Sequence, residues 1–104
     1  MIDRELVPVV AARFKALADP GRLTLLSVLQ GGERSVSELV TATGRSQPNV
    51  SQHLAGLAKA GLVAGRREGN HVFYQIADPY VLRICDAVCR GVRAERRRAG
   101  GKRG

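Results

Sequence analysis

Polar side chains that can bond to nucleic-acid bases are concentrated between residues 45 and 53. Glutamine and asparagine amides both donate and accept hydrogen bonds toward adenine, and serine can do either. Ser46 is also a suitable helix N-cap, and the N-terminus of a helix favours phosphate. The alternative is that these residues only cover an exposed helix face. The residues expected to contact DNA here are Arg45, Ser46, Gln47, Asn49, Ser51, Gln52 and His53.

A second candidate contact segment covers residues 66–70. Two arginines, Arg66 and Arg67, stand before a tight turn that ends in Asn70. Arginines on such a hairpin could bind phosphate or enter a minor groove. The alternative is a pair of solvated arginines that protect an edge strand from pairing. We expect all three residues to contact DNA.

The two cysteines of the chain, Cys85 and Cys89, are four residues apart. This spacing places both thiols on one helix face, with Cβ atoms ~6 Å apart, whereas a disulfide needs ~3.5–4.5 Å. The two could bind a thiophilic metal or metalloid ion, with Asp86 as a weak extra ligand, or undergo oxidation or persulfidation. They could equally be packed core residues. They are the sensor candidates, and the identity of any metal stays open.

Composition sets limits on the class of protein. The chain has 104 residues, which suits one domain, and only 4% are aromatic, so the core must be aliphatic. The formal net charge is +8, which indicates a polyanionic partner. Residues 90–104 hold seven basic residues and one acidic residue, so this charge lies mostly at the C-terminal end. There it adds attraction that does not depend on DNA sequence.

No apolar run approaches the ~18–20 residues of a membrane span, and no secretory signal is visible, so we expect no membrane partner. Two cysteines do not make a disulfide framework, which favours a reduced, cytoplasmic setting. The lone histidines His53 and His71 have no ligand partner at useful spacing. Ser51 and His53 have no orienting carboxylate in the sequence pattern, so we do not expect an enzyme.

These side chains require a helical scaffold with one hairpin. Apolar spacing and capping signals predict helices over residues 3–18, 20–30, 35–42, 46–61 and 79–95. Alternating residues predict strands over 62–67 and 71–76. The fold class is therefore mainly α, with five helices and a two-stranded wing, as in a winged helix-turn-helix. We expect a DNA-binding and dimerisation domain over residues 1–97 and a basic, disordered tail over 98–104.

Four motifs, in order, resemble the ArsR/SmtB family over roughly residues 8–92. The resemblance implies a winged helix-turn-helix homodimer that represses transcription and leaves its operator when it senses a metal, metalloid or other signal. It also implies that the first and last helices form the dimer interface. The motifs lie at residues 17–23 (LADPGRL), 46–54 (SQPNVSQHL), 60–63 (AGLV) and 67–70 (REGN), followed by Tyr74.

The small size of the chain also favours a dimer, because it leaves little room to bury the apolar stripes of the first and fifth helices. Recognition helices about 34–36 Å apart would then read a near-palindromic operator in double-stranded DNA. The chain departs from the family pattern at Ala55 and Gly56, where members often carry a basic residue. One phosphate contact of the family is therefore in doubt.

The metal sites that the resemblance implies are incomplete in this sequence. No cysteine lies near residues 36–39, where the family has a thiolate site. On the last helix Asp78 matches the family's zinc ligands, but Tyr80 replaces the histidine, and Gly91 and Ala94 stand at the later positions. The sequence therefore identifies no definite cofactor, and only Cys85 and Cys89 are left for a possible thiophilic metal or metalloid ion.

Two other functions fit parts of the sequence. A basic RNA-binding or ribosome-associated protein would account for the charge, although the chain lacks an aromatic platform for stacking bases. A winged helix without an inducer is the second alternative, and it would leave the cysteines as core packing.

Overall fold

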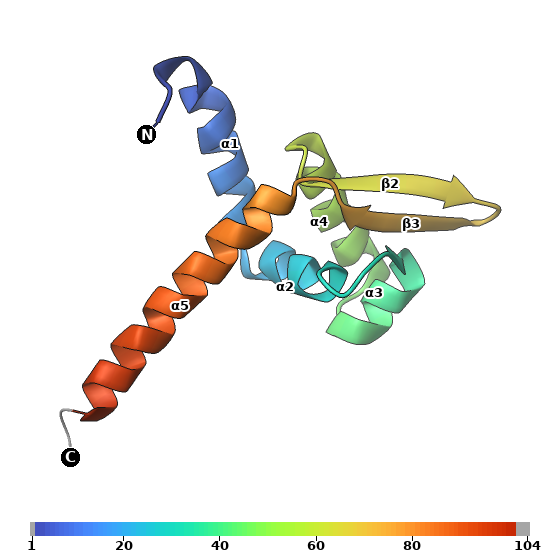
Figure 1. The fold of residues 1–104 in the computed structure, drawn as a ribbon. Coiled ribbons are helices and arrows are strands. Elements are labelled where there is room, and N and C mark those ends of the chain that lie inside the picture. The colour runs from blue at the N-terminus through green and yellow to red at the C-terminus, as the bar shows by residue number, and fades with distance from the viewer. Residues whose placement is uncertain (1, 102–104) are drawn as a thin grey trace.

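The computed structural model describes residues 2–101 as a helical body with a hairpin on one side and two projecting helices (Figure 1). The elements are η1 (Arg4–Leu6), α1 (Val7–Leu17), α2 (Pro20–Leu29), β1 (Arg34–Ser35), α3 (Val36–Thr43), α4 (Gln47–Lys59), β2 (Val63–Glu68), β3 (His71–Ile76) and α5 (Pro79–Gly101). The predicted winged helix-turn-helix fold is confirmed, with α3 and α4 as the helix pair and β2–β3 as the wing.

Side-chain caps set the boundaries of the central helices. The Asp19 carboxylate accepts a hydrogen bond from the Arg22 backbone N–H at 3.0 Å, which starts α2. At the start of α3 the Ser35 hydroxyl accepts from the Glu38 N–H at 3.1 Å, and the Glu38 carboxylate accepts from the Ser35 N–H at 2.8 Å. Gly44, with φ of 70°, ends α3 in the left-handed conformation. These signals are local, which is why the sequence revealed them.

The sheet has three antiparallel strands in the order β1-β3-β2, one more than the sequence predicted. The extra strand, β1, is only two residues long and pairs Arg34 with Tyr74 and Ser35 with Phe73. Two residues are too few to show an alternating pattern. At the wing tip a two-residue loop joins β2 to β3, and Gly69 has φ of 61° there. Glycine at the first loop position is typical of a type II′ turn.

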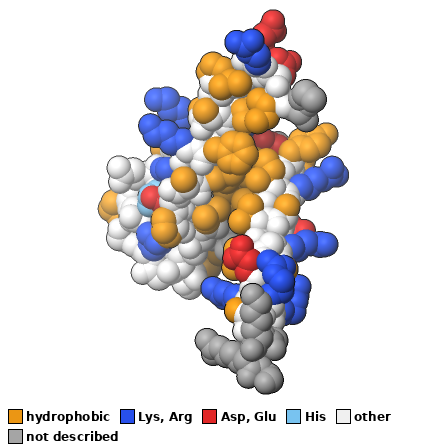
Figure 2. Space-filling view, turned by 90° about the vertical axis from the view of Figure 1, so that its left-hand side faces the viewer, with side chains coloured by type: hydrophobic (Ala, Val, Ile, Leu, Met, Phe, Trp, Pro, Cys, Tyr) orange, Lys and Arg blue, Asp and Glu red, His pale blue; other side chains and the backbone are white. Residues whose placement is uncertain are grey.

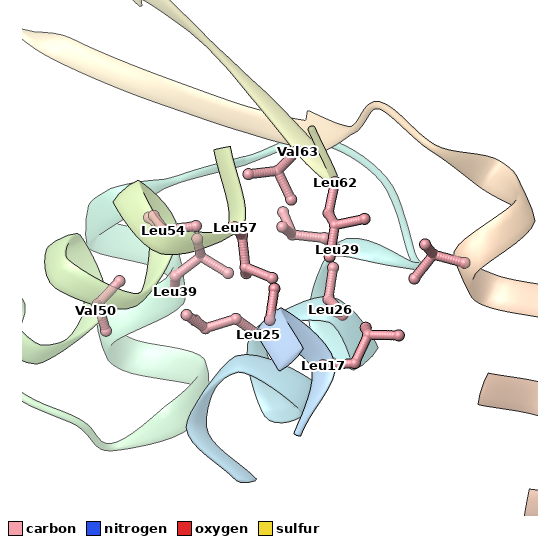
Figure 3. Close-up of a cluster of buried hydrophobic side chains, with 12 residues drawn as sticks. Leu17, Leu25, Leu26, Leu29, Leu39, Val50, Leu54, Leu57, Leu62 and Val63 are labelled. Atoms are coloured by element: carbon pink, nitrogen blue, oxygen red, sulfur yellow. The ribbon is translucent and has the colours of Figure 1, made fainter. Parts of the chain in front are cut away.

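The hydrophobic core is aliphatic, as the low aromatic content predicts (Figure 3). It lies where α2, α3 and α4 meet the base of the wing, so its packing fixes α4 relative to the hairpin. The largest fully buried side chains are Leu25, Leu29, Leu39, Leu54, Leu57, Leu62 and Val50.

Helix α5 is longer than the predicted 79–95 and continues through Gly101. Residues 98–101, which we expected to belong to a disordered tail, are therefore helical. Arg98 and Ala99 favour helix, and arginines near a helix C-terminus stabilise the helix dipole, although Gly100 and Gly101 do not favour it. The rest of the expected tail, residues 102–104, lies outside the described residues.

Helices α1 and α5 project from the body and leave apolar side chains in solvent (Figure 2). The radius of gyration is 16.0 Å, whereas a compact domain of this length has about 13 Å. The most exposed apolar side chains on these helices include Val9, Phe14, Tyr80, Val88 and Val92. None of the helices in residues 2–101 is both long enough and apolar enough to cross a membrane.

Gly56, in the interior of α4, lies beside the Arg22 side chain. A Cβ atom at Gly56 would lie 3.4 Å from Arg22 Nη1, an ordinary contact distance. Because glycine inside a helix costs about 1 kcal/mol relative to alanine, Gly56→Ala should raise the free energy of unfolding by ~0.5–1 kcal/mol. Urea denaturation of both proteins measures this change. A loss of stability would show that Arg22 cannot yield even slightly.

Candidate nucleic-acid interface

The exposed face of α4 lies opposite the face that packs in the core. Val50, Leu54 and Leu57 are buried, and Gln52 lies in the middle of the solvent-exposed side of the helix with Ala55. Core packing on one side therefore holds the Gln52 amide out in solvent on the other. This amide has the freedom to donate and accept toward a base edge.

The N-terminal turn of α4 is capped and polar. The Ser46 hydroxyl accepts from the Asn49 N–H at 3.2 Å, and Gln47 Nε2 donates to Ser51 Oγ at 3.2 Å. Gln47 and Ser51 line a groove whose other wall is the wing, at Asn70 and Val72. The structure thus brings Gln47, Ser51 and Asn70, predicted from separate segments, to one groove.

Arg67 and Arg66 point to opposite faces of the wing because side chains alternate along a strand. Arg67 is paired with Val72, which lines the groove next to α4. The Arg67 side chain is exposed and makes no ion pair within residues 2–101. It is therefore available to a phosphate beside the groove.

Arg66, which we expected to contact DNA, is paired with carboxylates of its own chain. Its Nε and Nη2 donate to the two Glu33 carboxylate oxygens at 3.0 and 2.8 Å, and Nη1 donates to Glu68. The guanidinium also lies 4.7 Å from the centre of the Phe73 ring. The Arg66 hydrogen bond lowers the pKa of Glu33, and the two carboxylates raise the pKa of Arg66. Arg66 therefore ties the wing to the loop before β1.

Three other predicted contact residues lie beside the start of α2. Arg45 Nη1 donates to Asn49 Oδ1 at 3.2 Å, and both side chains are half-buried. His53 is only 17% exposed, with its Nε2 3.7 Å from Asp19 Oδ1. The backbone N–H of Arg22 is the main cause that lowers the pKa of Asp19, and the nearby His53 contributes. His53 thus faces α2, on a different side of α4 from Gln52.

Gly21 makes this approach of α2 to α4 feasible. A Cβ atom there would lie 2.7 Å from His53 Nε2 and 2.9 Å from Arg45 Nη1, so a larger residue would displace both side chains. Sequence reasoning missed this contact. The signal that could have revealed it is Gly21 itself. Glycine does not stabilise the first turn of a helix, so its presence there indicates that another segment packs closely against it.

The two cysteines lie on the α5 face that borders α2. Cys85 is half-buried and Cys89 is exposed, and both line a groove with Leu23 and Leu26 of α2. Burial, followed by the neighbouring Cys89, raises the pKa of the Cys85 thiol. Asp86, the extra metal ligand considered above, accepts a hydrogen bond from Arg90 at 2.9 Å. Within residues 2–101 no group of three or more His, Cys, Asp or Glu side chains could hold a metal ion.

Comparison with known proteins finds relatives that are all described as transcriptional regulators or repressors. The family model described as "Bacterial regulatory protein, arsR family" matches residues 19–64. A "Probable mercury resistance operon repressor" of Streptomyces lividans is 46% identical over 82 residues, which cover 78% of this chain and 63% of that protein. An uncharacterised HTH-type transcriptional regulator of Mycobacterium tuberculosis strain H37Rv is 41% identical over 95 residues, which cover 90% and 82% of the two chains. The chain thus spans less than two thirds of the first relative.

A solved structure resembles the fold closely. The solution structure described as the homodimeric winged helix-turn-helix DNA-binding domain of a possible ArsR-family regulator from Mycobacterium bovis aligns with a TM-score of 0.76. It is 40% identical, and the alignment covers 92% of this chain and 90% of that one.

The two wing arginines should behave differently when neutralised. Arg67→Gln should reduce the slope of log K against log salt on random-sequence duplex DNA by about 0.9 per bound subunit, because one phosphate contact is lost. Arg66→Gln should leave the slope unchanged and accelerate hydrogen exchange in β2 and β3, because the tie to Glu33 is lost. Fluorescence anisotropy and exchange mass spectrometry measure these effects. The interpretation is wrong if Arg66→Gln alone lowers the salt slope.

Proposed function

The chain belongs to the arsR family of bacterial regulatory proteins, and on this premise we propose that it is a homodimeric transcriptional repressor. In this proposal its two α4 helices read a near-palindromic operator, and a thiol-directed signal at Cys85 and Cys89 releases the DNA. The carrying observation is that Gln52 stands on the exposed side of α4, while Gln47 and Ser51 of the same helix border a groove with the wing that carries the exposed Arg67. A regulator of this kind acts in the cytoplasm, in agreement with the cysteine usage.

The contact set in this proposal is narrower than the sequence predicted. Gln52 reads bases from the exposed face of α4, Gln47 and Ser51 border the groove, and Ser46 offers the capped helix end to phosphate. Arg67 and Asn70 supply phosphate contacts from the wing. Arg45, Asn49, His53 and Arg66 hold the reading elements in place through contacts within the chain.

Helices α1 and α5 provide the dimer interface in this proposal. Arg13 Nη1 of α1 donates to Asp78 Oδ2, just before α5, at 2.7 Å, so the two helices are joined at one end. An apolar hollow between them is lined by Phe14, Leu17 and Ile84. A second copy would cover these surfaces and place two α4 helices on one face of the dimer, at the ~34–36 Å spacing of adjacent major grooves.

The groove between α5 and α2 supports a role for the thiols in release. A change in volume or charge at Cys85 and Cys89 acts directly on α2, because Leu23 and Leu26 form the opposite wall. Helix α2 in turn contacts α4 through Gly21. Two thiolates suit a soft ion of low coordination number, or a second pair across the dimer axis, and oxidation or persulfidation needs no further ligand.

A repressor without an inducer is the second candidate function. The partial burial of the Cys85 thiol and its raised pKa favour this candidate. A half-buried thiol with a raised pKa is less often a thiolate, so it is less reactive and suits packing. Cys89 is exposed, and its reactivity separates the two candidates.

Base reading by Gln52 can be tested with an operator selected from random DNA. Gln52→Ala should weaken binding to this operator by about tenfold or more, because a bidentate base contact contributes ~1–3 kcal/mol of discrimination. Binding to unrelated duplex should change little. Gln75→Ala, on the wing face that carries Arg66, is the matched control. Equal losses on both DNAs would remove Gln52 from base reading.

The thiol signal can be tested with a double variant, Cys85→Ser with Cys89→Ser. We expect it to bind the operator like the parent protein. The parent should be released from the operator by at least one of Zn²⁺, Cd²⁺, arsenite, persulfide and peroxide, and the variant should not respond to that compound. Operator anisotropy during each titration measures release. If the variant is released normally, or if the parent responds to none of the compounds, the cysteines serve packing alone.

A further inference from the structure

Helix α5 carries a basic stripe apart from its apolar stripe. At 100° per residue, Arg83, Arg90, Arg93 and Arg97 share one side of the helix, and all four are exposed. Ile84, Val88 and Val92 lie on another side. If the apolar stripe is buried between two subunits, the basic stripe stays at the surface of the dimer. Because α5 is helical through Gly101, these arginines have fixed relative positions.

The basic stripe is separated from the reading face of α4 by α2. Leu23 and Leu26 of α2 face α5, whereas Gly21 and Leu25 pack toward α4. Gln52 is on the side of α4 away from its buried face. The wing and the C-terminal end of α5 also lie at opposite ends of the molecule (Figure 1). DNA in contact with α4 and the wing therefore does not reach the stripe of the same subunit.

We propose that the arginine stripe of α5 binds a second segment of duplex DNA, outside the operator. This inference rests on the proposed function, because it assumes a dimer already seated on an operator. One repressor dimer would then hold two DNA segments, one through α4 and the wing and one through α5.

Charge and geometry favour duplex DNA as the occupant. The stripe carries four arginines against one acidic residue on the same side of the helix, Asp86, and arginine side chains gather near this end of the molecule (Figure 2). Arg90 to Arg97 spans about 10 Å along the helix, and duplex DNA carries one charge per ~1.7 Å, so several phosphates lie within reach. Arginine suits phosphate through its planar donors. Arg90 is held only by the exposed Asp86 pair, which is a weak interaction.

The test uses the full-length dimer on its selected operator. The operator complex is immobilised, and a labelled short duplex of unrelated sequence is titrated at low salt. The stripe variant is Arg90→Gln with Arg97→Gln, because Arg93 lines the groove that holds the two cysteines. The matched control is Arg96→Gln with Arg98→Gln, which removes the same charge from the same helix end but from other faces. Analytical ultracentrifugation verifies that all three proteins are dimers.

We expect the parent complex to capture the second duplex and the stripe variant to capture it about tenfold less, with a salt slope lower by ~1.8 per engaged subunit. The control variant should capture it normally, and operator affinity should stay within about twofold throughout. Equal losses in both variants would reduce the effect to net charge and overturn the proposal. So would stronger capture of structured RNA or anionic vesicles, or no capture. Failure to select any operator would instead refute the proposed function.

Discussion

The approach of α2 to α4 at Gly21 is the contact on which the other surfaces depend. The side chains of His53 and Arg45 come within about 3 Å of where a Cβ atom would stand, so they pack directly on the α2 backbone at this position. Leu25 and Leu54 fill the space below this contact. The core packing of Val50, Leu54 and Leu57 sets the direction of α4 and keeps Gln52 in solvent, and Gly21 leaves room for His53 and Arg45 beside α2. The same α2 forms one wall of the cysteine groove, so it links the thiols to the reading helix.

Apolar surface that the chain does not bury alone explains the need for a partner. Full burial of a large apolar side chain is worth about 1.5–3 kcal/mol, and association costs an estimated 4–15 kcal/mol in lost freedom. Phe14, Ile84, Val88 and Val92 are each about half exposed, so burying what remains of them in both subunits contributes roughly 6–11 kcal/mol, which is of the same order as that cost. The Arg13–Asp78 pair matters here because it joins α1 to the start of α5, so both helices meet a partner as one surface.

Features of the sequence that act over a few residues were predictable, and those that depend on distant partners were not. The Ser35–Glu38 capping box, the Asp19-Pro20 start and the tight turn at Gly69 each act over two to four residues, so the elements were found nearly at their true limits. The direction of Arg66 depends on Glu33, 33 residues away, and the direction of His53 depends on Asp19. Residue type alone shows that these side chains can bind phosphate or bases, but not that partners within the chain already hold them.

The net charge of +8 gains a different meaning once its place is known. The charge of residues 90–104 was expected only to add attraction that does not depend on DNA sequence, yet four arginines of α5 lie on one side of an ordered helix, with α2 between that helix and the exposed face of α4. A flexible tail can follow whatever phosphate is near, whereas a stripe on a rigid helix has a fixed direction. The electrostatic attraction of these arginines for DNA phosphate is therefore confined to one surface of α5. It still does not depend on the DNA sequence. In the proposed function, sequence selection rests on Gln52 and its neighbours, and the arginine stripe would hold a further duplex beside the operator whatever its sequence.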